Sequence, residues 1–249
     1  KQRVFLCGDA AHIWIPMGGF GMNAGVEDAI NLSWKLSANL SGWANSNLLD
    51  TYEVERRSIG QLVAGSAAKI FEDLYQIPVE HALHEAEGAL AVAHRADVGQ
   101  SITKHNVAEF DSIGMQLGVA YDNSPAIVYD GALTPEFAIN KYVESSRPGV
   151  RAPHFWRSSG AALYDDLGPE FTLLRIGPNP PDARALVAGF AAHKVPLKVL
   201  DIHEPIAAQK YENYPLVLVR PDQHIAWRAR QNPTDVDEII FTVTGASQK

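Results

Sequence analysis

Residues Arg3–Ala29 read RVFLCGDAAHIWIPMGGFGMNAGVEDA, and this stretch decides how the rest of the chain is interpreted. The apolar run Val4–Cys7 predicts a short buried strand, and glycines and Pro16 then predict a loop. After the loop, apolar residues recur at helical spacing as far as Leu40, which predicts a long helix. The stretch is therefore expected to fold as strand, glycine loop and helix.

Gly18, Gly19 and Gly21 stand immediately before the predicted helix. Without side chains, these positions would let a planar ligand lie against the backbone. The first N–H groups of a helix have no internal partner, and the helix dipole favours negative charge at that end. The sequence therefore predicts a site for an anionic group at the start of this helix.

The same residues resemble the second flavin-contacting motif of the flavin-dependent aromatic hydroxylases, of the para-hydroxybenzoate and phenol hydroxylase type. The matching segments are Gly8–His12 (GDAAH), Pro16, Gly19–Asn23 (GFGMN) and Asp28–Leu36 (DAINLSWKL). The resemblance implies that Asp9 binds a ribityl hydroxyl of FAD. It also implies that Pro16, the candidate catalytic position, offers its carbonyl beside the reactive carbon of the flavin.

For the remaining candidate residues, the resemblance implies contact with FAD along the backbone. Gly18 and Gly19 would leave room for the cofactor, and Gly21, Met22 and Asn23 would face the pyrimidine edge of the flavin. Each residue also has a simpler interpretation. Asp9 could be only a turn former. Residues 19–24 also fit the G-x-G-x-x-A dinucleotide fingerprint, but no βαβ unit is predicted around them.

His12 could act as an acid or base, but we interpret it as a structural hydrogen-bonding residue. The sequence shows no carboxylate spaced to orient it. Glu53 and Arg57, four residues apart on the next predicted helix, are assigned to an ion pair rather than to chemistry. His81, His84 and Glu85 could be imagined as metal ligands, but ordinary helix formers surround them, so no metal site is expected.

The chain has 249 residues, a net charge of −8 and one cysteine, Cys7. The negative charge argues against nucleic acid or an acidic membrane as a partner, because both require basic patches. One cysteine cannot form an internal disulfide, which favours a cytoplasmic location. No apolar run approaches the length of a membrane span, and no signal peptide is visible.

Three segments are predicted along the chain. Residues 1–77 would be the C-terminal segment of an FAD-binding domain, with a second helix over Leu48–Tyr75. Residues 78–147 would be a helical connector, with a helical stretch over Pro78–Asn106 broken at Gly99. Because the chain begins at Lys1 and lacks the family's ADP-binding motif, it is expected to be the C-terminal part of a longer enzyme.

Residues 148–249 are predicted to form a thioredoxin-like domain, which makes the whole a mixed α/β (α+β) fold. The expected elements are a strand (171–176), a helix (181–193), a strand (197–202), a hairpin with a Pro-Asp turn (216–228) and a helix (235–243). Without C-x-x-C, thiol redox chemistry is excluded for this domain, whose expected roles are packing, dimerisation or covering the site. Tyr214-Pro215 directly precedes the hairpin, where thioredoxin-like folds commonly carry a cis proline.

The leading functional hypothesis is a monooxygenase that uses FAD, NAD(P)H and O₂ to hydroxylate a small aromatic substrate. A homodimer is possible. One alternative is a flavin-dependent reductase without oxygen transfer. Another is a scaffold or dimerisation module that is inactive by itself, because the ADP-binding half is absent.

Overall fold

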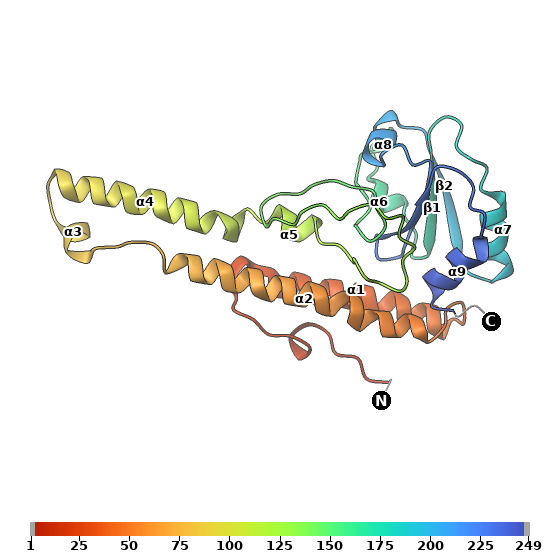
Figure 1. Ribbon diagram of the computed structural model, residues 1–249, viewed down its shortest axis with the longest axis horizontal. Coiled ribbons are helices and arrows are strands. Elements are labelled where there is room, and N and C mark those ends of the chain that lie inside the picture. Colours follow the sequence, from red (N-terminus) through yellow and green to blue (C-terminus); the bar gives the residue numbers. More distant parts are fainter. Residues whose placement is uncertain (1–2, 247–249) are drawn as a thin grey trace.

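The computed structural model describes residues 3–246. Residues 1–2 of the first predicted segment and residues 247–249 of the last lie outside the described residues. Two long helices, α1 (Phe20–Leu40) and α2 (Asn47–Leu74), lie side by side along the molecule. A small sheet with its own helices sits at the end where α1 turns into α2 (Figure 1). The described part of the chain is therefore elongated, with the glycine loop at the opposite end of α1.

The α1–α2 pair forms because each helix buries one stripe of residues spaced by three or four positions. On α2 this stripe includes Leu48, Tyr52, Ile59, Val63 and Ile70. The predicted second helix, Leu48–Tyr75, differs from α2 by one residue at each end. Polar side chains interrupt both stripes, and these form the buried networks described below.

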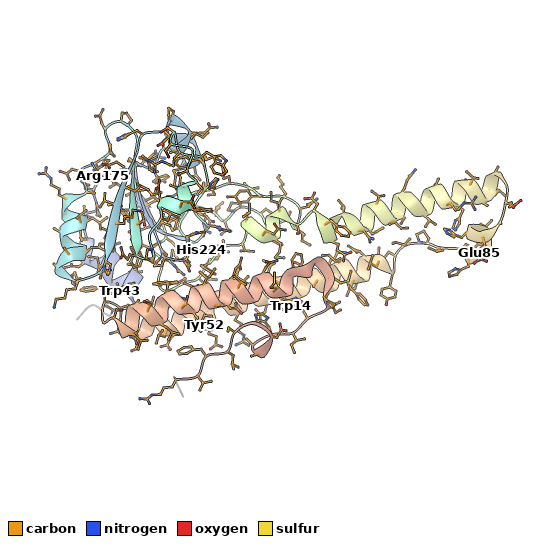
Figure 2. The ribbon with its side chains drawn as sticks, turned by 180° about the vertical axis from the view of Figure 1, so that it is seen from behind. Trp14, Trp43, Tyr52, Glu85, Arg175 and His224 are labelled. Carbon is orange, nitrogen blue, oxygen red and sulfur yellow. The ribbon has the colours of Figure 1, made fainter. Side chains whose placement is uncertain are left out.

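The connector begins with α3 (His81–Glu85), α4 (Ala89–Phe110) and α5 (Ile113–Leu117). The first turns of α4 extend with α3 beyond the end of α2, and Glu85 lies near the tip of this arm (Figure 2). The predicted break at Gly99 is wrong, because α4 continues through it. A glycine costs an exposed helix only about 1 kcal/mol relative to alanine, so the neighbouring turns carry the helix across it.

The C-terminal part contains α6 (Leu163–Asp166) and then the sheet. Its elements in order are β1 (Phe171–Ile176), α7 (Arg184–Ala192), β2 (Leu197–Ile202), α8 (Pro205–Lys210), β3 (Leu216–Val219), β4 (Ile225–Ala229) and α9 (Val236–Thr244). The strand order is β2-β1-β3-β4, with β1 and β2 parallel and the other two pairs antiparallel. The predicted β-α-β then β-β-α order and the mixed α/β (α+β) class are confirmed; α8 is an addition.

Both faces of this sheet are covered, which explains why its central strands are continuous apolar runs. One face carries Phe171, Leu173 and Leu218 and packs against α7, α9 and the end of the α1–α2 pair around Trp34. The opposite face carries Leu174 and its neighbours and packs against α8 and residues 150–163. Figure 2 shows Trp43 where the helix pair meets the sheet.

The connector also protects the free edge of β4. Val128 N–H donates to the carbonyl of Ala226 at 2.8 Å, and Gly149 N–H donates to that of Ile225 at 2.8 Å. Ile225 N–H in turn donates to the carbonyl of Val150 at 2.9 Å. An unpaired edge strand can pair with another chain and so promote aggregation. These bonds satisfy the edge of β4 within the chain.

The predicted strand at Val4–Cys7 is wrong. This segment is extended at Cys7 but pairs with no strand among the described residues. Val4 is 83% exposed and Leu6 is 56% exposed, so the segment is not buried either. Its apolar composition predicts burial, but a strand needs a hydrogen-bonded neighbour, and no described part of the chain supplies one.

The predicted cis bond before Pro215 is also wrong, because no peptide bond in residues 3–246 is cis. The turn into β3 is made instead by Glu212 and Asn213, both in the left-handed region with φ of 53° and 57°. With the chain already reversed, the trans isomer, favoured by about 0.5–1 kcal/mol, is retained. The Pro215 carbonyl accepts the N–H of Ile176 at 2.8 Å.

A buried ionic cluster joins the helix pair to the sheet. The Glu55 carboxylate on α2 accepts two bonds from Arg220, at 2.6 and 2.9 Å, one from Lys35 at 2.6 Å and one from Ser124 at 2.5 Å. Arg220 follows β3, and its guanidinium also bonds to Asp222 in the hairpin turn. The side chains of Glu55, Lys35 and Arg220 are fully buried.

The charges in this cluster stabilise one another. Burial by itself raises the pKa of Glu55, but Arg220 and Lys35 outweigh it and lower this pKa to about 2. Burial lowers the pKa of Lys35 to about 8, with Glu55 opposing the shift. Glu55 is therefore ionised at neutral pH, and its charge is compensated only while the sheet stays seated on the helices.

Replacing Glu55 with glutamine should lower the free energy of unfolding by about 3–5 kcal/mol, because it leaves Lys35 buried without its counter-ion and removes one of the two carboxylates that bind Arg220. Urea unfolding followed by circular dichroism measures the change. The matched control is Glu53→Gln, on the same helix. Glu53 is 75% exposed in its ion pair with Arg57, a predicted pair that is confirmed at 3.2 Å. The control should stay within about 0.5 kcal/mol of the wild type; similar losses in both variants would contradict the assignment.

Candidate functional site

The glycine loop begins with a tight turn that lies against α1. Residues Gly8–Ala10 form a single 3₁₀ turn, η1, closed by the N–H groups of Ala11 and His12 on the Gly8 carbonyl at 2.8 and 3.1 Å. Gly8 has φ of 56°, in the region that favours glycine. The turn leaves the Asp9 side chain exposed to solvent.

Asp28, on the third turn of α1, holds the η1 turn in place. Its Oδ2 accepts the Gly8 N–H at 3.0 Å and lies 2.7 Å from Nε2 of His12. Since a carboxylate only accepts, His12 donates from Nε2. The other oxygen, Oδ1, accepts from Nε of Arg56 at 2.7 Å. One buried carboxylate thus bonds to two points of the turn and to α2.

Hydrogen bonds and charge keep Asp28 ionised. Burial alone raises its pKa, but bonds from Arg56, Gly8 and His12 outweigh this and hold the pKa below its usual value. Arg56 is itself fixed by the Ala24 carbonyl at 3.3 Å and by Glu27 at 3.1 Å. Asp28 is only 1% exposed, so no water competes for these bonds.

A glycine on α1 allows the turn to come this close, whereas a side chain at position 60 of α2 would make only ordinary van der Waals contact. A Cβ added to Gly25 on α1 would lie 3.3 Å from the Cα of Gly8. A Cβ on Gly60 of α2 would lie 3.7 Å from the His12 ring. On its other side this ring stacks on Trp14, with centroids 4.5 Å apart; Figure 2 shows Trp14 beside the start of α1.

The second half of the loop brings the chain sharply into α1. Met17–Gly19 form another 3₁₀ turn, η2, in which Gly18 and Gly19 are both left-handed, with φ of 73° and 64°. Phe20 follows and is 5% exposed, packed among Ile59 and other apolar residues of α2 and the connector. The buried Phe20 ring anchors the helix start, and the two glycines provide the backbone conformation that this requires.

The helix begins earlier than the sequence predicts. Its N-cap is Gly19, so Gly21 lies within the first turn instead of before the helix. No side chain caps this end. The N–H groups through Met22 therefore lack an intrahelical acceptor, whereas Asn23 is the first residue whose N–H can reach the Gly19 carbonyl. The free N–H groups among the three predicted contacts are therefore those of Gly21 and Met22, and the predicted contact of Asn23 with the cofactor stays a prediction.

Most of the candidate cofactor residues are exposed to solvent. Asp9, Pro16, Gly19, Met22 and Asn23 are exposed, and Gly18 and Gly21 are half-buried. Several apolar side chains of the same segment are exposed as well: Ile13 is 85% exposed, Met22 78% and Val26 51%. Their contact with a cofactor stays a prediction, but the accessibility that it requires is present.

His12 is a structural hydrogen-bonding residue, as predicted, but the reason given for this is wrong. A partner carboxylate does exist, Asp28, sixteen residues away in sequence and brought close by the folding of the loop onto α1. Sequence reasoning also missed Arg56 and the close approach at Gly25. The sequence did contain a signal for this pairing: charged residues lie on the apolar stripes of the two helices, and buried charges are almost always paired.

Other candidate sites have less support. Within residues 3–246, no three His, Cys, Asp or Glu side chains gather as metal ligands, and no helix is both long and apolar enough to cross a membrane. Cys7 is exposed. Two surface hollows of the described residues lie at the opposite end of the helix pair, around Asn47 and Trp43, away from the glycine loop.

Comparison with known proteins gives two family matches. Residues 1–67 match the family model "FAD binding domain", and residues 145–246 match "Aromatic-ring hydroxylase, C-terminal". The chain is 31% identical over 234 residues to the FAD-dependent monooxygenase opdD of Penicillium oxalicum, covering 91% of this chain and 44% of that protein. It is 30% identical over 274 residues to the phenol 2-monooxygenase of a Pseudomonas species, covering 98% and 45%.

Among solved structures, the rebeccamycin biosynthetic enzyme RebC with reduced flavin superposes with a TM-score of 0.89 at 35% identity. The match covers 98% of this chain and 45% of RebC. This chain therefore spans less than half the length of the relatives that it matches.

The loop geometry predicts opposite effects for two neighbouring glycines. Gly18→Ala should lower the free energy of unfolding by about 1–2 kcal/mol or more, because alanine disfavours a left-handed backbone. Its Cβ would also overlap the Phe20 ring. Gly21→Ala should be neutral or stabilising by up to about 1 kcal/mol, because its Cβ meets open space within a helix. Urea unfolding of both variants tests this, and equal effects would contradict the described loop.

Proposed function

We propose that this chain is part of an aromatic-ring monooxygenase and corresponds to the C-terminal part of the FAD-dependent aromatic hydroxylases. The proposal combines two matches, one to an FAD-binding domain and one to the C-terminal domain of ring hydroxylases. The structural feature that carries it is the uncapped start of α1 behind two left-handed glycines. A scaffold role or a reductase would leave the hydroxylase-type C-terminal match unexplained.

The residues of the loop fit FAD. An added Cβ at Gly19 or Gly21 would meet no heavy atom within 4 Å, so the backbone is open to a flat ligand. The first free N–H groups of α1, at Gly21 and Met22, suit the pyrimidine edge, where reduced flavin carries negative charge. The exposed Asp9 carboxylate suits a ribityl hydroxyl, because it accepts two or more hydrogen bonds.

FAD, when bound, would supply the redox chemistry: NAD(P)H would provide two electrons, and O₂ would provide the oxygen atom inserted into the ring of a small aromatic substrate, with the second oxygen atom leaving as water. The chain contributes binding and position. Pro16 offers its carbonyl as a fixed acceptor beside the reactive part of the site, and Asp9 anchors the cofactor chain. The apolar residues Ile13 and Met22, exposed here, exclude water once the site is closed.

The relatives support an aromatic substrate without defining it. One is named phenol 2-monooxygenase and another tetracenomycin A2 monooxygenase-dioxygenase. One solved structure holds aklavinone with FAD. We infer a flat phenolic or polyketide-like substrate for this protein and a cytoplasmic, possibly homodimeric, enzyme. The division into segments 1–77, 78–147 and 148–249 is part of the same proposal.

Replacing Asp9 with alanine in the full-length protein should weaken FAD binding by about 1.5–3 kcal/mol, the contribution of a hydrogen bond to a charged group. Isothermal titration of the apoprotein with FAD measures the change. Glu53→Ala, which removes an exposed carboxylate on α2, is the control and should bind as the wild type does. Retention of wild-type affinity by Asp9→Ala would refute the role given to Asp9.

The start of α1 can be tested through the redox potential. Met22→Pro deletes one free N–H within the first turn, whereas Met22→Leu keeps it and preserves an exposed apolar side chain. The proline variant should make the two-electron flavin potential more negative by roughly 7–40 mV, from a helix-terminus contribution of about 0.3–2 kcal/mol. The leucine variant should shift it much less. Equal shifts would place the effect in the side chain and reject the helix-terminus account.

A further inference from the structure

We propose that Asp28 is the positioning residue of the flavin loop and that Arg56 keeps it in the required orientation. The inference rests on the proposed flavin site, but it concerns residues that would not touch the cofactor. Asp28 is 1% exposed and Arg56 is 5% exposed, so neither is accessible to a ligand. Their effect on the site is exerted through the backbone of Gly8 and the ring of His12.

Both ends of the turn that carries Asp9 are hydrogen-bonded to one oxygen, Oδ2 of Asp28. Gly8 N–H and His12 Nε2 both donate to Asp28 Oδ2, at 3.0 and 2.7 Å. Asp9 lies between them in sequence and makes no hydrogen bond of its own to the helices among the described contacts. The position of the exposed Asp9 carboxylate is therefore set by Asp28.

Among the described residues, no side chain other than that of Asp28 forms a hydrogen bond with Gly8–His12. Val4 and Leu6, which precede it, are exposed, and the chain there pairs with no described strand. Tyr52 bonds to the Leu6 carbonyl at 2.7 Å, but this fixes the segment before the turn and not the turn itself. Gly8 and Gly25 have no side chains and make only a van der Waals contact between their backbones, so this contact does not fix the orientation of the turn.

Arg56 fixes which oxygen of Asp28 faces the turn. Its Nε bonds to Oδ1 at 2.7 Å, and its remaining N–H groups bond to Ala24 O, Glu27 and the Tyr121 hydroxyl. The guanidinium is thereby held on three sides and directs Oδ2 toward Gly8. An asparagine at position 28 could not serve the same donors, because its amide would present N–H groups to Arg56 or to the Gly8 N–H.

The test uses Asp28→Asn and, as the matched control, Glu27→Gln. Glu27 is the neighbouring residue and also pairs with Arg56, at 3.1 Å, but it makes no bond to Gly8 or His12, and a glutamine there keeps an acceptor oxygen for Arg56. Amide hydrogen exchange of residues 8–12 is measured first, relative to exchange in the middle of α2. Asp28→Asn should accelerate exchange at Gly8 about 10- to 100-fold beyond any change in α2, whereas Glu27→Gln should not.

FAD affinity of the full-length variants is measured next. Asp28→Asn should weaken it about tenfold, and Asp28→Glu, which keeps the charge, should recover part of the loss. If exchange rises equally in the turn and in α2, Asp28 only stabilises the helix pair, and the positioning role is rejected. It is also rejected if the wild type binds FAD and Asp28→Asn binds it equally well. If the wild-type protein binds no FAD, the proposed function fails, and the exchange experiment still decides whether Asp28 positions the turn.

Discussion

The structure depends on the burial of one carboxylate, that of Glu55, at the junction of the helix pair and the sheet. Isolated in the interior it would be costly to ionise, because an uncompensated buried charge loses its hydration. Arg220, Lys35, Asn31 and Ser124 surround it with hydrogen bonds. These partners come from α1, the connector and the hairpin turn after β3. The charge is satisfied only when three distant parts of the sequence are assembled together.

Aromatic rings complete this junction. The Arg220 guanidinium lies over the rings of Trp34 and Tyr121, with distances of 5.1 and 5.3 Å to the centroids. Asp222 Oδ2 accepts from Trp34 Nε1 at 3.2 Å, which ties the hairpin turn directly to α1. Rings on both sides keep water from the ion pairs and give the pairs a fixed geometry. A salt bridge of this kind contributes specificity of docking more than net stability.

The Tyr121 hydroxyl connects this junction to the loop at the far end of the helices. It accepts from Asn31 at 3.2 Å and from Arg56 at 3.3 Å. Asn31 also donates to Glu55, and Arg56 also donates to Asp28. Tyr121 belongs to the connector, so the segment with the least regular structure bridges the two ionic clusters. The loop that we assign to FAD is thus joined to the C-terminal sheet by continuous hydrogen bonds. This continuity gives the C-terminal part, which contains no cysteine, a structural connection to the loop.

The sequence by itself determined the long helices, the sheet elements and the candidate face of the loop. Local spacing and the residue order Gly8–His12 and Gly19–Asn23 carry that information without reference to distant residues. It failed where the outcome depended on neighbours in space. Val4–Cys7 is apolar but finds no strand to pair with, and the bond before Pro215 stays trans because Glu212 and Asn213 already turn the chain. The partner of His12 and the counter-ions of Glu55 were likewise decided only by tertiary structure. Hydrogen bonds between buried charges depend on distances of about 3 Å, and residues 16 to 165 positions apart reach such distances only after the chain has folded.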